Sequence, residues 1–152
     1  MTEEDFNALW KDLVKRSHRV DGPSLSEHER RFYAVNLLRG SVPRSGFIGY
    51  FENWNSSEIA SAHEGLRALR LLPALALLEK AQNTVLGDRP LPSGSSPVPV
   101  FPDSLNEEED ERESNRIDEA LGPVEEEFCK QDDMIWNALC EYADKHQLKP
   151  EG

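Results

Sequence analysis

The residues of this sequence that most often carry chemistry are its histidines, its cysteines and its many carboxylates. His18, His28, His63 and His146 fall in four separate segments, and none is followed by a second histidine at the spacing of a helical zinc site. Each is therefore interpreted as a surface or helix-end residue. The sequence predicts no metal and no other cofactor.

The cysteines and the glycines do not form a catalytic motif either. Cys129 and Cys140 are 11 positions apart in a stretch predicted to be helical, which would separate them by about 16 Å. They are interpreted as buried thiols of a reducing compartment. The sequence has no G-x-S-x-G elbow, no glycine-rich phosphate loop and no G-x-G-x-x-G. We therefore expect a protein that is not an enzyme.

The acidic residues are unevenly distributed along the chain. The 152 residues carry a net charge of −12, yet residues 1–92 hold as many basic as acidic side chains, 12 of each. The whole excess lies in residues 93–152, with 17 acidic and 5 basic side chains. Such a one-sided field repels nucleic acid and anionic membranes and attracts basic partners. Direct binding to DNA, RNA or a membrane is therefore not expected.

Most of this charge falls in residues 103–133, and thirteen of the carboxylates there are predicted to contact a partner. On a helix, side chains three or four positions apart lie about 5–6 Å from each other, a spacing comparable to that of neighbouring phosphates. A fixed acidic surface of this kind can imitate DNA. The predicted partner-binding residues are Glu107, Glu108, Glu109, Asp110, Glu111, Glu113, Asp118, Glu119, Glu125, Glu126, Glu127, Asp132 and Asp133.

Two other interpretations of the acidic residues stay open. In the first, the protein is an immunity or antitoxin protein that masks a basic nuclease. In the second, it is a helical domain whose acidity serves only solubility.

Apolar periodicity and capping residues predict helices throughout the N-terminal part. The first helix spans residues 3–18 and is capped by Thr2, and a second begins after Ser24 or Ser26 and reaches Leu38. Gly40 is predicted to end it. The aromatic, turn-rich residues 41–55 are predicted to form a loop with one helical turn.

Further helices are predicted from Ser56 or Ser57 onward, and from Pro73 to just before Gly87. Residues 88–103 contain half of the ten prolines and are predicted to be a linker or strap. Acidic C-terminal helices should occupy residues 104–152, with a break at Gly122 and Pro123. No alternating strand pattern occurs.

These patterns predict an all-α fold, a single-domain helical bundle of about six or seven helices with a proline-rich strap, covering residues 1–152. No window approaches the roughly 18 apolar residues of a membrane span. The N-terminus is acidic and amphipathic where a signal peptide would be basic and then apolar. A cytoplasmic location is therefore expected.

The sequence also resembles a known family. The resemblance lies in residues 24–86 and 115–147 and is carried by Leu25-Ser26-Glu27, Tyr33, Leu37-Leu38, Gly46-Phe47, Tyr50-Phe51, Asn53, Ala76-Leu77-Leu78, Ile117-Asp118, Phe128 and Tyr142. In these positions the chain resembles the helical DNA-mimic protein family, long classed as a domain of unknown function. Its usual Asn-Gly-Gly-Phe turn is Arg44-Ser45-Gly46-Phe47 here.

The resemblance implies an all-helical protein, often dimeric. Its acidic face would occupy the DNA-binding surface of a basic protein such as a helix-turn-helix transcription factor. A homodimer and a basic, DNA-binding protein partner are accordingly expected.

Overall fold

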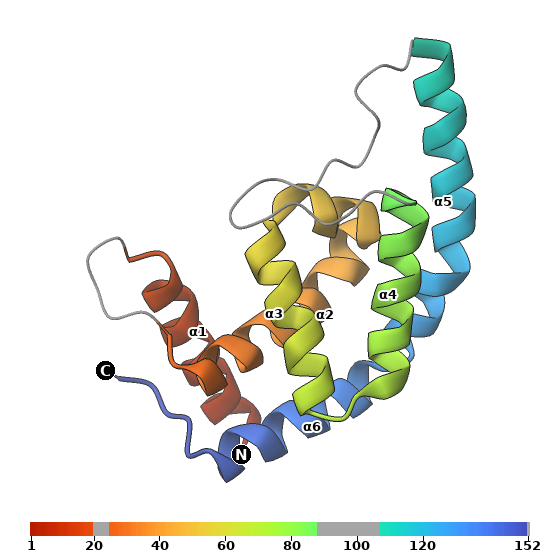
Figure 1. Cartoon of the computed structure of the whole chain (residues 1–152). Coiled ribbons are helices and arrows are strands. Elements are labelled where there is room, and N and C mark those ends of the chain that lie inside the picture. Colours follow the sequence, from red (N-terminus) through yellow and green to blue (C-terminus); the bar gives the residue numbers. More distant parts are fainter. Residues whose placement is uncertain (20–24, 88–106, 152) are drawn as a thin grey trace.

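The computed structural model describes residues 1–19, 25–87 and 107–151. The described residues form six helices and no strand, which confirms the all-α prediction (Figure 1). The helices are α1 (Glu3–Ser17), α2 (Glu27–Asn53), α3 (Ser56–Ala68), α4 (Leu72–Leu86), α5 (Glu107–Cys129) and α6 (Asp132–Lys145). The predicted proline-rich strap, residues 88–103, lies outside the described residues.

Helix α2 lies at the centre of the bundle and contacts α1, α3, α5 and α6. Its start is confirmed at Ser26, whose hydroxyl accepts from the Glu29 N–H while the Glu29 carboxylate accepts from the Ser26 N–H. Thr2 and Asp5 form the same reciprocal cap at the start of α1. Satisfying free amides in this way fixes where both helices begin.

The predicted end of the second helix at Gly40 is wrong. Leu38 and Val42 are both buried, so the apolar stripe continues past Gly40, and α2 runs on to Asn53. The break occurs instead at Gly46, where φ is +71° and ψ is 178°. Only glycine adopts this conformation readily, so Gly46 divides α2 into two differently directed parts.

The aromatic residues after the break were predicted to lie in a loop with one helical turn, and they form the second part of α2. Phe47, Tyr50 and Phe51 have no exposed surface and belong to the core. The aromatic side chains of this segment therefore fill the centre of the bundle.

Helix α3 begins at Ser56 as predicted, and α4 begins and ends close to its predicted limits. Asn55 caps α3 by accepting from the Glu58 N–H. Gly87 ends α4 with a φ of +61°. Helix α3 packs tightly on α2 at Gly65, where there is no room for a side chain. A Cβ added to Gly65 would lie 2.6 Å from Val35 Cγ2 and 2.9 Å from the Arg31 carbonyl oxygen. No helix in the described ranges is long and apolar enough to cross a membrane.

The predicted break at Gly122 and Pro123 is also wrong, because α5 continues through both residues to Cys129. The chain turns later, at Lys130 and Gln131, before α6 begins. Buried side chains on both sides of Pro123 hold α5 against the bundle, and this packing outweighs the backbone cost of an internal proline.

This turn also places the cysteines on different helices. Both thiols are free, and Cys129 is exposed rather than buried as predicted, because it lies at the end of α5.

The break at Gly46 can be tested by comparing two glycines of α2. An alanine at Gly46 must adopt a positive φ, and its Cβ would lie 2.6 Å from Glu125 Oε1. We expect Gly46→Ala to lower the free energy of unfolding in urea by about 2 kcal/mol or more. Gly40 has open space around it, so Gly40→Ala should raise the free energy by about 0.5–1 kcal/mol. Equal stability of the two variants would contradict this assignment.

Candidate partner-binding surface on helix α5

The C-terminal half of α5 is anchored in the core by one apolar stripe. Ile117, Leu121, Val124 and Phe128 recur at helical spacing and are at most 3% exposed. They pack against α2 and α4, and the Phe128 ring meets the Phe47 ring edge-on with centroids 5.5 Å apart. This half of the helix therefore has a fixed position in the fold.

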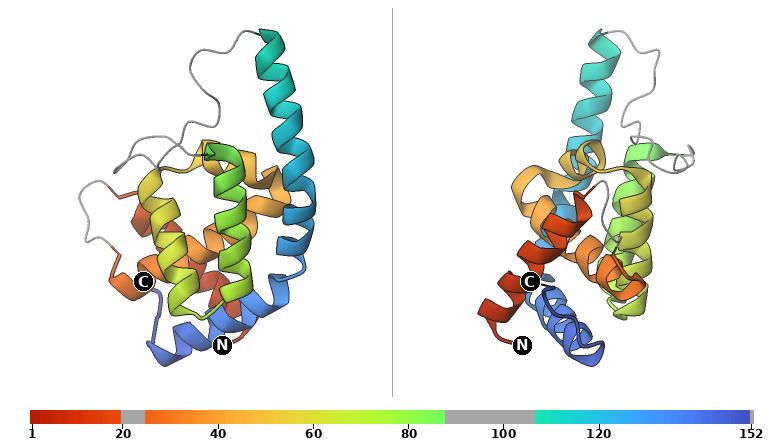
Figure 2. Two further views of the ribbon diagram at one scale, coloured as in Figure 1. Left: turned by 45° about the vertical axis from the view of Figure 1, so that its right-hand side comes forward. Right: turned by 90° about the vertical axis from the view of Figure 1, so that its left-hand side faces the viewer.

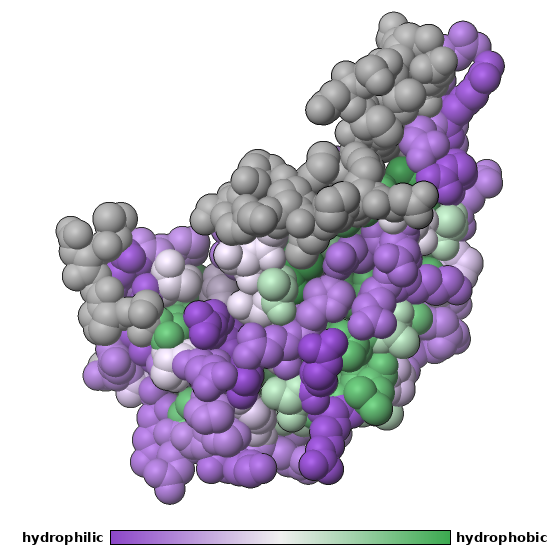
Figure 3. All heavy atoms as spheres, viewed as in Figure 1, coloured by the Kyte–Doolittle hydropathy of each residue, from purple (hydrophilic) through white to green (hydrophobic). Residues whose placement is uncertain are grey.

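The N-terminal half of α5 extends beyond the body of the bundle (Figures 1 and 2). None of the described side chains from Glu108 to Arg116 is buried. The visible surface of this half is strongly hydrophilic (Figure 3). Its carboxylates are therefore accessible to another molecule.

The charge density of α5 is close to that of a nucleic-acid strand. Its 23 residues include 11 acidic and 2 basic side chains, a net charge of −9. At 1.5 Å per residue this is about one negative charge per 4 Å of helix axis. One strand of DNA carries about one charge per 3.4 Å.

Two of the thirteen predicted partner-binding residues are instead used inside the protein. Glu125 Oε1 accepts a hydrogen bond of 2.9 Å from the Phe47 N–H, directly after the break in α2. Asp132 accepts from Arg39 at 2.8 Å and 3.3 Å and so links the start of α6 to α2. Both carboxylates hold helices together.

Three more of the predicted residues are paired with cations of their own segment. Glu108 accepts from Arg112 at 3.1 Å, Glu113 from Arg116, and Glu127 from Lys130 at 3.0 Å. Hydrogen bonding to Glu113 raises the pKa of Arg116, and hydrogen bonding to Glu127 raises the pKa of Lys130. These exposed pairs contribute little stability, but they partly neutralise the helix surface.

Five predicted residues stay exposed and form no salt bridge or side-chain hydrogen bond in the part of the chain that the structure describes, although the charge of Glu126 also contributes to the raised pKa of Lys130. They are Glu111, Asp118, Glu119, Glu126 and Asp133. The remaining three, Glu107, Glu109 and Asp110, have side chains outside the described set.

Four of these exposed residues lie on one face of α5. Successive residues of a helix are rotated by about 100°, which places Glu111, Asp118, Glu119 and Glu126 within an arc of about 100°. This arc points away from the buried stripe of Ile117, Leu121, Val124 and Phe128. We call these four carboxylates the acidic face. Along the axis they span about 22 Å.

All thirteen carboxylates were predicted to form one group, and the prediction did not distinguish the internal, the locally paired and the free members. The local pairs could have been predicted from helical spacing, since Arg112 is four residues after Glu108 and Lys130 is three after Glu127. No local signal distinguishes Glu125 from Glu126, because the partner of Glu125 is 78 positions away.

Within the described ranges, no three histidine, cysteine, aspartate or glutamate side chains gather closely enough to hold a metal ion.

These observations define an acidic, all-α protein with an anchored helix that presents free carboxylates. The model of the DMP19-like protein family matches residues 23–146, and the chain belongs to this family. The match includes α2 to α6, whereas α1 precedes it. No curated protein and no solved structure matches the chain.

The internal role of Glu125 can be separated from the exposed role of its neighbour by substitution. Glu125→Ala removes the acceptor for the Phe47 N–H, and we expect the free energy of unfolding to fall by about 1–3 kcal/mol. Glu126→Ala removes an exposed carboxylate with no described partner, so the change should stay within about 0.5 kcal/mol. Chemical unfolding of both variants measures the difference. A Glu125→Ala variant as stable as Glu126→Ala would show that this hydrogen bond does not anchor α5.

Proposed function

We propose that this protein acts without catalysis as a DNA mimic. The acidic face of α5 would occupy the DNA-binding surface of a basic protein, such as a helix-turn-helix transcription factor. The observation that carries this proposal is the set of four exposed, unpaired carboxylates on one side of an anchored helix. The four carboxylates of the acidic face give about one negative charge per 6 Å of helix axis, and the whole of α5, with its net charge of −9, gives about one per 4 Å, against about one per 3.4 Å for a DNA strand.

The physical basis of such binding is electrostatic. Carboxylates held on a folded helix are already in place, so little conformational entropy is lost when a basic surface meets them. Charge complementarity speeds encounter and disfavours partners with negative surfaces. The affinity should consequently depend strongly on salt.

Membership of the DMP19-like protein family supports the proposal in one further respect. The match covers the anchored half of α5 together with the parts of α2 and α4 on which it packs. The scaffold that presents the acidic face is therefore part of the family fold. A homodimer stays a prediction from the family resemblance.

The proposal is tested by capturing partners from a lysate of the native host and measuring the purified partner's affinity. We expect capture of a basic DNA-binding protein that double-stranded DNA displaces. If four ion pairs form, the affinity should fall about a hundredfold between about 50 mM and about 200 mM salt. The variant that neutralises the acidic face should lose this capture; it carries Glu111→Gln, Asp118→Asn, Glu119→Gln and Glu126→Gln.

The matched control removes the same number of charges from exposed, unpaired positions on four other helices. It carries Glu4→Gln, Glu52→Gln, Glu79→Gln and Glu141→Gln, and it should bind as the unmodified protein does. Equal loss in both variants would indicate a general charge effect and contradict the proposal. Capture of a nuclease whose activity is blocked would favour the immunity-protein interpretation. Salt-insensitive capture, or none, would leave solubility as the role of the acid.

A further inference from the structure

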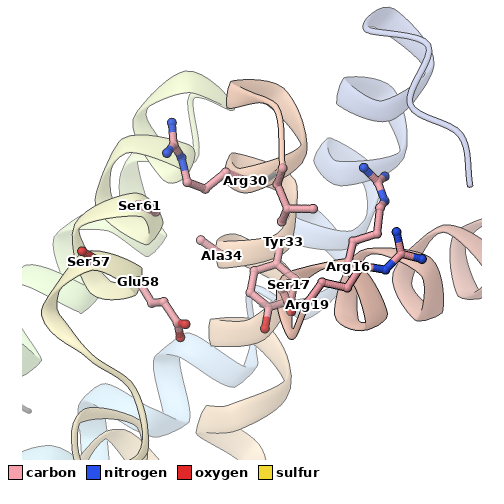
Figure 4. A pocket seen from close by; sticks show the side chains of 10 residues that line it. Arg16, Ser17, Arg19, Arg30, Tyr33, Ala34, Ser57, Glu58 and Ser61 are labelled. Carbon is pink, nitrogen blue, oxygen red and sulfur yellow. The ribbon is translucent and has the colours of Figure 1, made fainter. Parts of the chain in front are cut away.

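The first turns of α2 have two sides with different surroundings. On one side, Arg30, Tyr33 and Ala34 line a pocket of about 370 Å³ between α2 and its neighbours α1 and α3 (Figure 4). On the other side, His28 and Arg31 lie against the end of α6. This second contact is at the end of the molecule opposite to the exposed half of α5 (Figures 1 and 2).

Three aromatic side chains form the contact between α2 and the end of α6. The rings of His28 and His146 are stacked, with centroids 3.7 Å apart and an interplanar angle of 16°. The Tyr142 ring lies beside both, with its centroid 5.6 Å from that of His28 and 4.4 Å from that of His146. His28 Nδ1 and the Tyr142 hydroxyl are 2.7 Å apart and share a hydrogen bond. We call these three residues the histidine clasp, because they join the start of α2 to the end of α6.

The surroundings of the clasp disfavour positive charge on its imidazoles. Tyr142 is 8% exposed, and both imidazoles are half-buried. Partial burial lowers the pKa of His146, and the neighbouring His28, Lys145 and Arg31 lower it further. The clasp therefore favours the neutral form of His146.

Three carboxylates near the clasp already have cationic partners. Glu27 and Glu64 both pair with Arg31, at 2.6 Å and 2.8 Å. Asp144 pairs with the amino group of Met1 at 3.0 Å. These carboxylates compensate a positive charge on the imidazoles less well than unpaired carboxylates would.

The stacked pair can hold one proton more easily than two. One charged ring stacks well on a neutral ring. At the observed separation, a second positive charge makes the second protonation less favourable by about tenfold or more. The closed clasp thus binds protons less readily than the separated imidazoles do. Its stability is complete above about pH 7 and is lost as the pH falls below the ordinary histidine value of about 6.5.

We propose that the histidine clasp is an acid-sensitive switch, closed when at most one imidazole is charged and open when both are charged. Opening separates His146 from His28 and frees the end of α6 with the residues that follow. In the closed form the Leu148 N–H donates to the Ala143 carbonyl oxygen at 2.9 Å, and this hydrogen bond is broken in the open form.

The opening is confined to the end of α6. The first part of this helix stays in place, because Ile135 and Leu139 are buried in the core and Asp132 pairs with Arg39 at 2.8 Å. Helix α5 packs on α2 and α4 and keeps its position. The switch is therefore independent of the proposed DNA mimicry and can be tested without a partner.

The first experiment is a nuclear magnetic resonance titration of the histidine side chains in the full chain. His28 and His146 should titrate in two steps, about one pH unit or more apart. In His28→Gln, the titration of His146 should move to a pH that is higher by about half a unit or more, because the repulsion between the rings is gone. His18→Gln is the matched control, since His18 is an exposed histidine at the end of α1, and it should leave both steps unchanged.

The second experiment measures hydrogen exchange of the backbone amides, corrected for the intrinsic effect of pH. The Leu148 amide should exchange about tenfold or more faster at about pH 5 than at about pH 7.5, while the Phe128 amide of α5 should not change. In His146→Gln the acid effect on Leu148 should disappear, because one imidazole remains. Both clasp histidines are partly exposed, so both variants should stay folded, as their melting curves will show.

The proposal is overturned if His146 titrates identically with and without His28, or if acid leaves the exchange of Leu148 unchanged. Acid acceleration that persists in His146→Gln would also overturn it, since the pair would then not be the cause. Equal acceleration of Phe128 and Leu148 at the same pH would indicate unfolding of the whole bundle and would overturn it as well.

Discussion

The hydrogen bond from the Phe47 N–H to Glu125 Oε1 is the contact on which the presentation of the acidic helix depends. The positive φ of Gly46 breaks α2 at this point and frees an amide that α2 itself does not satisfy. The carboxylate from α5 accepts from this amide, and the absence of a side chain on Gly46 leaves room for it. One backbone conformation thus joins the centre of the bundle to the helix that carries most of the charge.

The two halves of α5 need different surroundings: the C-terminal half must be buried, and the N-terminal half must lie in solvent. The C-terminal half buries Ile117, Leu121, Val124 and Phe128, which stabilises its position against α2 and α4. The N-terminal half holds closely spaced carboxylates, whose repulsion opposes compact packing. Because this half extends into solvent, water and salt screen the repulsion without disturbing the core. The fold can therefore tolerate a charge density that a buried helix could not.

The sequence predicted the elements governed by local rules. The caps at Thr2 and Ser26 and the end of α4 at Gly87 are confirmed, since each depends on residues a few positions apart. The helix limits at Gly40 and Pro123 were wrong because tertiary packing overrode local preference. The grouping of carboxylates was too coarse for a related reason, as the partners of Glu125 and Asp132 come from distant parts of the chain.

The central claim is that α5 holds its carboxylates in a fixed array, and nuclear magnetic resonance relaxation of the backbone amides of α5 tests it most directly. An order parameter near 0.85, continuous from Glu111 through Glu126 to Phe128, is the predicted result, since it is typical of rigid backbone. Values below about 0.6 from Glu111 to Glu119, with rigid backbone only beyond Leu121, would contradict the claim. The exposed carboxylates would then have no constant arrangement for a partner to bind.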